Sequence, residues 1–153
     1  MSAEAPQAGA GLSARDTIEL LGLALSRIQL FDGGELALIE LTAEDFERTH
    51  ADESQSEGVI DHLRALQGAK AAVLVRDILA GERRGQRKVS LRATDTELDV
   101  SAIARAQGGG GHTRAAGFST TLSTPELVAF LRGEIAAQRE HADTPEQAAT
   151  TLA

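Results

Sequence analysis

Four consecutive glycines followed by a histidine limit most strongly what this chain can fold into. The glycines occupy residues 108–111, and the chain continues as His112-Thr113-Arg114-Ala115-Ala116-Gly117. Each glycine adds backbone freedom that folding must remove, so we do not expect the run to serve packing or propensity. Without Cβ atoms, successive backbone N–H groups can turn toward one point and form a nest for an anion. The run therefore predicts a phosphate site, and a turn of helix over residues 112–116 would add free N–H groups to it.

A flexible linker is the alternative interpretation of a glycine run. No serine or proline surrounds these glycines, and a histidine and the small residues 115–117 follow closely. These neighbours favour a binding loop over a linker. The loop is not a Walker loop, because no Gly-Lys-Ser/Thr follows, and it lacks the spacing of a dinucleotide fingerprint.

A clear alternation of apolar and polar residues predicts a strand over residues 87–94. Val89 and Leu91 point to one face, while Lys88, Ser90 and Arg92 point to the other. This face carries two positive groups and a hydroxyl. For the arginines of the preceding turn we expect solvated surface positions; they are Arg83, Arg84 and Arg87.

Composition sets the class of protein and of ligand. The 153 residues suffice for one domain with a useful core, and with only 3% aromatic residues this core must be aliphatic. The net charge of −8 disfavours long nucleic acid, whereas a short ligand needs only a local cluster of cations. Such a cluster occurs between residues 76 and 92 and comprises Arg76, Arg83, Arg84, Arg87, Lys88 and Arg92.

The sequence also predicts a cytoplasmic protein with no membrane-spanning segment. The chain has no cysteine, which fits a reducing compartment and excludes disulfides and thiolate metal sites. We find no signal peptide and no apolar run long enough to span a bilayer.

Periodicity predicts an α/β (α+β) fold, a mixed sheet of four to five strands packed with helices. The expected strands are 35–41, 69–79, 87–94 and 118–122, and the expected helices are 16–30, 43–49, a segment ending near 68, 100–107 and a last one from 124. We expect residues 1–14 to be disordered, one domain over 15–139 with a connector helix in 15–31, and a flexible tail over 140–153.

Polar residues ahead of the apolar stripes predict helix starts. Thr42, Asp99 and the Ser123–Glu126 pair are expected caps, and Ser54 with Glu57 matches the capping-box pattern. A cap is the plain structural role for Glu57.

The sequence Gly-Gly-Gly-Gly-His-x-x-Ala-Ala-Gly over residues 108–117 closely resembles the signature of the DHH-associated domain. This is the C-terminal substrate-binding domain of the DHH phosphoesterases, and the nanoRNase and pAp phosphatase branch, with its cyclic-dinucleotide phosphodiesterase relatives, is the most similar. The likeness extends in the family's order to residues 56–61, 88–92 and 99–104, and covers roughly residues 16–137.

The resemblance implies a phosphate- or nucleotide-binding domain of a hydrolase that cleaves short oligonucleotides, as an oligoribonuclease does, or pAp or cyclic dinucleotides. The implied substrate-binding residues are Gly108, Gly109, Gly110, Gly111, His112, Arg92, Ser90 and Glu57. Asp61 stands where the nearest relatives often have asparagine, which puts a carboxylate beside the presumed anion site. Ser56 replaces a common threonine, which is a milder change.

The catalytic centre is expected on another domain. In DHH phosphoesterases two metal ions, Mn or Mg, are held by a separate DHH domain. This chain has no Asp-His-His triplet, and its only Asp-His pair is Asp61-His62, followed by Leu63. We therefore expect no catalytic residue, metal site or cofactor here, and activity only with a DHH partner domain in cis or in trans.

Two further hypotheses remain open. One is a stand-alone nucleotide or nucleic-acid binding module, although the scarcity of aromatic residues disfavours single-strand binding. The other is a non-catalytic remnant that serves in assembly, for which the over-apolar first helix is the best support. A homodimer is one assembly that the sequence allows.

Overall fold

The computed structural model describes residues 14–65 and 68–142. The strands are β1 (Gln29–Phe31), β2 (Leu36–Leu41), β3 (Ala71–Asp77), β4 (Arg87–Ala93), β5 (Gly110–Gly111) and β6 (Ala115–Thr120). The helices are α2 (Ala14–Leu25), α3 (Ala43–Thr49), α4 (Ser56–Leu63), α5 (Val100–Arg105) and α6 (Thr124–Ala142), with short 3-10 turns η1 (Asp32–Gly34) and η2 (Glu53–Gln55).

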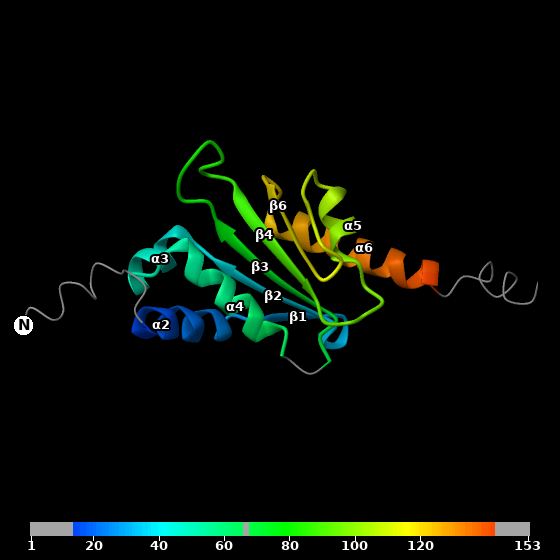
Figure 1. Ribbon diagram of the computed structural model, residues 1–153, viewed down its shortest axis with the longest axis horizontal. Coiled ribbons are helices and arrows are strands. Elements are labelled where there is room, and N and C mark those ends of the chain that lie inside the picture. The colour runs from blue at the N-terminus through cyan, green and yellow to red at the C-terminus, as the bar shows by residue number, and fades with distance from the viewer. Residues whose placement is uncertain (1–13, 66–67, 143–153) are drawn as a thin grey trace, which may run out of the picture.

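A single mixed sheet carries the fold, with the strand order β1-β2-β3-β4-β6-β5. Strands β2 and β3 are parallel, and the other neighbours are antiparallel. Helices α2, α3 and α4 lie on one face and α5 and α6 on the other (Figure 1). The predicted α/β architecture is confirmed, with six strands instead of four or five.

The two additional strands, β1 and β5, form from segments whose local sequence pattern does not predict a strand. Residues 29–31 were expected to end the first helix, but α2 stops at Leu25 and they form an edge strand beside β2. Ile28 and Leu30 extend the apolar pattern in either conformation, so pairing with β2 decides the outcome. Strand β5 consists of two glycines, which have low strand propensity and become a strand only by pairing with β6.

Strand β3 is buried on both faces, as its continuous apolar run predicts. Val73 and Val75 belong to the apolar cluster under α5 and α6, whereas Ala72 and Leu74 belong to the cluster under α2, α3 and α4. One strand therefore joins two cores.

The predicted cap of α3 is confirmed. Thr42 accepts a hydrogen bond from the backbone N–H of Asp45, and the Asp45 carboxylate accepts one from the N–H of Thr42 at 2.7 Å. Arg27, just after α2, donates to the same carboxylate at 2.5 Å. Burial raises the pKa of Asp45, but the hydrogen bonds from Arg27 and Thr42 lower it more, so the net shift is downward.

The predicted capping box of Ser54 and Glu57 is wrong. Asp52 is the cap residue and Gln55 completes the box, because the chain first makes the 3-10 turn η2. Helix α4 starts at Ser56 and ends at Leu63, short of the expected end near residue 68. Glu57 is thereby left for a contact across the fold.

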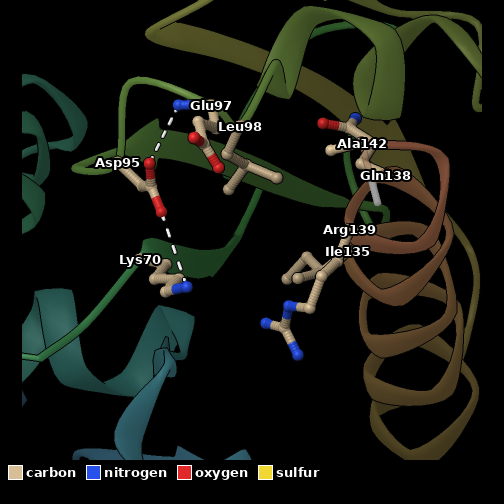
Figure 2. A pocket seen from close by; sticks show the side chains of 8 residues that line it. All are labelled: Lys70, Asp95, Glu97, Leu98, Ile135, Gln138, Arg139 and Ala142. Atoms are coloured by element: carbon tan, nitrogen blue, oxygen red, sulfur yellow. Dashed lines mark hydrogen bonds and ion pairs between the residues drawn. The ribbon is translucent and has the colours of Figure 1, made fainter. Parts of the chain in front are cut away.

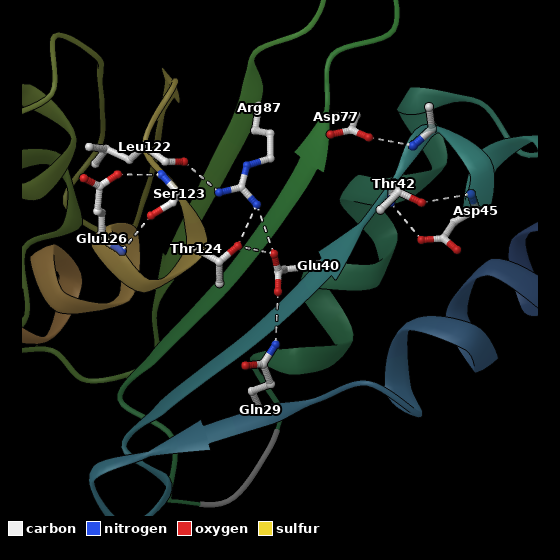
Figure 3. Close-up of polar contacts among 11 residues, drawn as sticks. Gln29, Glu40, Thr42, Asp45, Asp77, Arg87, Leu122, Ser123, Thr124 and Glu126 are labelled. Atoms are coloured by element: carbon white, nitrogen blue, oxygen red, sulfur yellow. Dashed lines mark hydrogen bonds and ion pairs between the residues drawn. The ribbon is translucent and has the colours of Figure 1, made fainter.

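Arg87 is a structural residue, and the prediction that it is solvated is wrong. Its guanidinium donates to Glu40 at 3.0 Å, to Thr124 at 2.9 Å and to the carbonyl of Leu122 at 2.9 Å (Figure 3). These bonds tie β2, β4 and the start of α6 together. Ser123 and Glu126 cap α6 as predicted.

The predicted end segments fall mostly outside the described residues. Residues 1–13 and 143–153 are not described, while α6 continues through Ala142, past the expected start of the tail at 140. None of the helices in the described ranges is long and apolar enough to cross a membrane.

Candidate functional site

One half of a sheet face carries polar and small residues instead of a core. The apolar cluster under α2, α3 and α4 takes residues from β2 and β3, and within the described residues it takes none from β4, β5 or β6. Directly paired residues of neighbouring strands share a face. The register therefore shows what β4, β6 and β5 present on this side.

Three rows of residues cross this half of the face, which we call the polar half-face. Arg92 pairs with Ala72 of β3 and with Ala115 of β6. Ser90 pairs with Leu74 and with Gly117, which in turn pairs with Gly110 of β5. Lys88 pairs with Arg76 and with Ser119. The alternation read from the sequence is confirmed, since Val89 and Leu91 are buried in the opposite core.

Arg92 is held by two carboxylates of α4. Its Nη2 donates to Glu57 at 2.9 Å, and its Nε lies 3.8 Å from the Asp61 carboxylate. The Arg92 side chain is 16% exposed, against 48% for Glu57 and 59% for Asp61. The two carboxylates lie one helical turn apart, so α4 presents both to the same arginine. Because both carboxylates are well solvated, each of these ion pairs contributes little to stability.

Ser90 is almost fully buried and yet lacks a hydrogen-bond partner. The residue is 4% exposed, and its hydroxyl makes no hydrogen bond to any residue that the structure describes. Among the described residues, the buried side-chain atom without a hydrogen bond is Arg76 Nε, so the Ser90 Oγ still reaches solvent on the polar half-face. Gly117, the neighbour of Ser90 across the sheet, has no side chain of its own, and the Lys88 side chain lies over it.

The glycine loop ends helix α5 in a Schellman motif. Gly108 has φ +83°, its N–H donates to the carbonyl of Arg105 at 3.0 Å, and the Gly109 N–H donates to Ala104 at 2.9 Å. The prediction that these N–H groups form an anion nest is therefore wrong for Gly108 and Gly109, because the helix end uses them.

Close packing explains two of the four glycines, contrary to the expectation from sequence. A Cβ on Gly109 would overlap the carbonyl oxygen of Gly117, and one on Gly111 would lie 2.6 Å from that of Ala115. Gly110 has open space where its Cβ would be, and it belongs to the row of Ser90. Gly110 is therefore the glycine of the run best placed to meet a ligand.

Residues 112–116 do not form the expected turn of helix. His112 donates its N–H to Ala115 at 2.7 Å and Ala115 returns one at 3.2 Å, which closes a hairpin between β5 and β6. Strand β6 accordingly starts at Ala115, three residues before the predicted start. As the partner of Ala115, His112 shares the face of Arg92, two strand spacings or about 10 Å away.

The structure thus brings together part of the predicted set of binding residues. Arg92, Ser90, Glu57, His112 and Gly110 lie on the polar half-face or at its rim. Gly108, Gly109 and Gly111 shape the loop.

Lys88 lies on the polar half-face, as the alternation predicts, but it is not among the binding residues predicted from the sequence. Its Cε lies 3.1 Å from the position that a Cβ of Gly117 would occupy, so the side chain folds over that glycine. Within residues 14–65 and 68–142 it has no carboxylate partner. The missing signal was the register of β4 with β6, which sequence alone does not provide.

A second hollow lies between α6 and the segment before α5, away from the predicted site residues (Figure 2). It encloses about 50 Å³. Its Lys70 lies 3.6 Å from Asp95 and 3.9 Å from Glu35, and its Arg139 pairs with Glu35. Acids therefore already satisfy its cations. Across the described part of the chain, no group of three or more His, Cys, Asp or Glu could hold a metal.

The family follows from the match of the sequence to known domains. Residues 38–137 match the model of the DHHA1 domain. This chain belongs to the DHHA1 domain family. The match includes β4, the glycine loop and the hairpin that build the polar half-face.

A solved structure shows the same fold within a longer protein. An exopolyphosphatase-related protein from Bacteroides fragilis is similar with a TM-score of 0.68 and 22% identity, over 82% of this chain and 35% of that one. A pGpG-specific phosphodiesterase from Vibrio cholerae is matched with a TM-score of 0.49 and 16% identity, over 78% of this chain and 37% of that one. The chain thus spans about a third of the length of either.

Proposed function

We propose that this domain holds the phosphate end of a short nucleotide ligand for a DHH catalytic domain. The ligand classes are short oligonucleotides, pAp and cyclic dinucleotides. Membership of the DHHA1 family supports the DHH partner, and the polar half-face supports a phosphate ligand. When bound to the DHH domain, two divalent metal ions, Mn or Mg, would activate water and stabilise charge at phosphorus.

The observation that carries this proposal is an arginine held by two solvated carboxylates next to a serine hydroxyl that makes no hydrogen bond to a described residue. A phosphate oxygen that takes the place of Glu57 on Arg92 Nη2 would make a charge-assisted hydrogen bond. Ser90, two residues along the strand, would donate its hydroxyl to the same group. His112 offers a ring N–H from the neighbouring hairpin in either protonation state. The role of these groups is to orient the ligand.

The test is an NMR titration of the chain with pAp and with a two-nucleotide RNA, without metal. We expect saturable shifts of the amides of Ser90, Gly110 and Gly117, with Kd in the range of about 10 μM to 1 mM. Arg92→Ala should weaken binding by about tenfold or more, because a hydrogen bond to a charged group contributes roughly 1.5–3 kcal/mol. A flat titration up to millimolar ligand would contradict the proposal.

Two companion variants show whether the effect is specific. Arg132 belongs to helix α6, on the opposite face of the sheet from the polar half-face, and forms an ion pair with Asp32 at 2.6 Å. Arg132→Ala should therefore leave the affinity for the ligand unchanged. Glu57→Gln keeps the shape of the side chain and removes a competing negative charge, so it should strengthen binding about two- to fivefold.

Assembly is the second candidate function, and exposed apolar side chains favour it. Ile18 and Leu25 of α2 and Leu30 of the edge strand β1 are exposed. A concentration-dependent oligomer in sedimentation, together with a flat ligand titration, would support assembly in place of phosphate binding.

A further inference from the structure

A cationic groove adjoins the polar half-face where the β3–β4 hairpin leaves the sheet. It has a volume of about 460 Å³, and its lining includes Arg76, Arg83, Lys88 and Ser119. Three of these residues form the row of the sheet next to that of Ser90 and Gly117. The groove is therefore continuous with the candidate phosphate site.

The charges in the groove are only partly neutralised. Arg76 forms an ion pair with Glu53, but its buried Nε has no hydrogen-bond acceptor. The side chains of Lys88 and Arg83 make neither a hydrogen bond nor an ion pair with any residue in the described ranges. Glu82 is the carboxylate in the lining, so two unpaired cations stand against one acid. An anion bound here would face a net positive wall.

The spacing of the two cationic positions limits what can bridge them. The Cα atoms of Lys88 and Arg92 lie about 13 Å apart, four residues along β4. The Lys88 side chain leans back over Gly117, whereas Arg83 lies in the hairpin beyond Lys88, so Arg83 is the cation of the groove farther from Arg92. The 3′ and 5′ phosphates of pAp sit on one ribose, and the phosphates of a cyclic dinucleotide share one small ring. Both pairs of phosphates are closer together than that. A linear oligonucleotide of three nucleotides is long enough to reach from one position to the other.

We propose that the groove of Arg83 and Lys88 is a second anion subsite, which takes a further phosphate of a linear oligonucleotide whose first phosphate lies at Arg92. This inference rests on the proposed function, because it needs the first phosphate at Arg92. With the second subsite, the domain would bind linear oligonucleotides more tightly than pAp and cyclic dinucleotides.

The experiment compares the affinities of pAp and of a 5′-phosphorylated trinucleotide RNA for the chain by NMR titration. The wild-type chain should bind the trinucleotide at least about fivefold more tightly than pAp. Arg83→Gln and Lys88→Gln should each bring this ratio down to within about twofold. For the trinucleotide, the slope of log K against log salt should become less steep by about 0.7 in each variant, the value for one phosphate contact on a single strand.

Arg84→Gln is the matched control, since Arg84 is the next residue of the same hairpin but lines a different groove beside α3. It should keep the wild-type ratio. Arg83 lies in the hairpin outside any strand, so its variant tests the subsite even if Lys88→Gln disturbs β4. Equal affinity for the two ligands in the wild type, or an unchanged ratio in both variants, would overturn the second subsite alone. Absence of saturable shifts with both ligands would overturn the proposed function as well.

Discussion

At the scale of single residues, the glycines of one loop have different roles that substitution can separate. Gly109→Ala should lower the free energy of unfolding by about 1–3 kcal/mol, because its Cβ would overlap the Gly117 carbonyl and β6 would have to shift. Gly110→Ala should be neutral or stabilising by up to about 1 kcal/mol, since its Cβ meets open space and the alanine restricts the unfolded chain. Urea unfolding followed by circular dichroism measures both.

The same pair of variants bears on the ligand site. Gly110→Ala should weaken pAp binding while the fold is retained, because the new methyl group stands in the row of Ser90. If Gly109→Ala and Gly110→Ala lowered the free energy of unfolding equally, the prediction that only Gly109 packs closely against β6 would be wrong.

At the scale of elements, the carboxylate of Asp45 joins α3 to the end of α2. Its lowered pKa means that the folded state favours the ionised form. The resulting stabilisation is complete above the unfolded-state pKa near 4, and it is lost as the pH falls through the lower pKa of the folded state. Asp45→Asn should therefore cost about 2 kcal/mol at pH 7 and progressively less below about pH 4.

Urea unfolding at pH 7 and pH 3 measures this dependence. Glu44→Gln is the control, because Glu44 lies in the same first turn of α3 but is exposed. It should change stability little at either pH. A cost of Asp45→Asn that is the same at both pH values would mean that its charge does not hold the two helices together.

At the scale of the whole molecule, the sheet should make the two cores unfold as one. Val73 and Leu74 are consecutive residues of β3, and they belong to opposite apolar clusters. Because neither cluster can lose this strand without exposing the other, we expect a single two-state transition. In a urea series the methyl signals of Val73 and Leu74 should disappear at the same midpoint. Midpoints that differ beyond experimental error would show that α2, α3 and α4 form a separate unfolding unit.

The sequence by itself determined the features that depend on short-range geometry. The cap at Thr42, the two-sided burial of β3 and the alternation of Val89 and Leu91 against Ser90 follow from bonds and spacings within a few residues. The glycine signature and its neighbours also indicated the DHH-associated domain, which the match over residues 38–137 bears out.

Only the tertiary structure decided which distant groups meet. Edge strands β1 and β5 pair with β2 and β6, which supply their hydrogen-bond partners, and the two glycines of β5 have a low strand preference of their own. Glu57 contacts Arg92 because α4 starts at Ser56, after a turn that takes over the capping. Lys88 lies over Gly117 because of the register of β4 with β6. Register and helix packing depend on long-range contacts that no local pattern encodes, and the candidate site is built from those contacts.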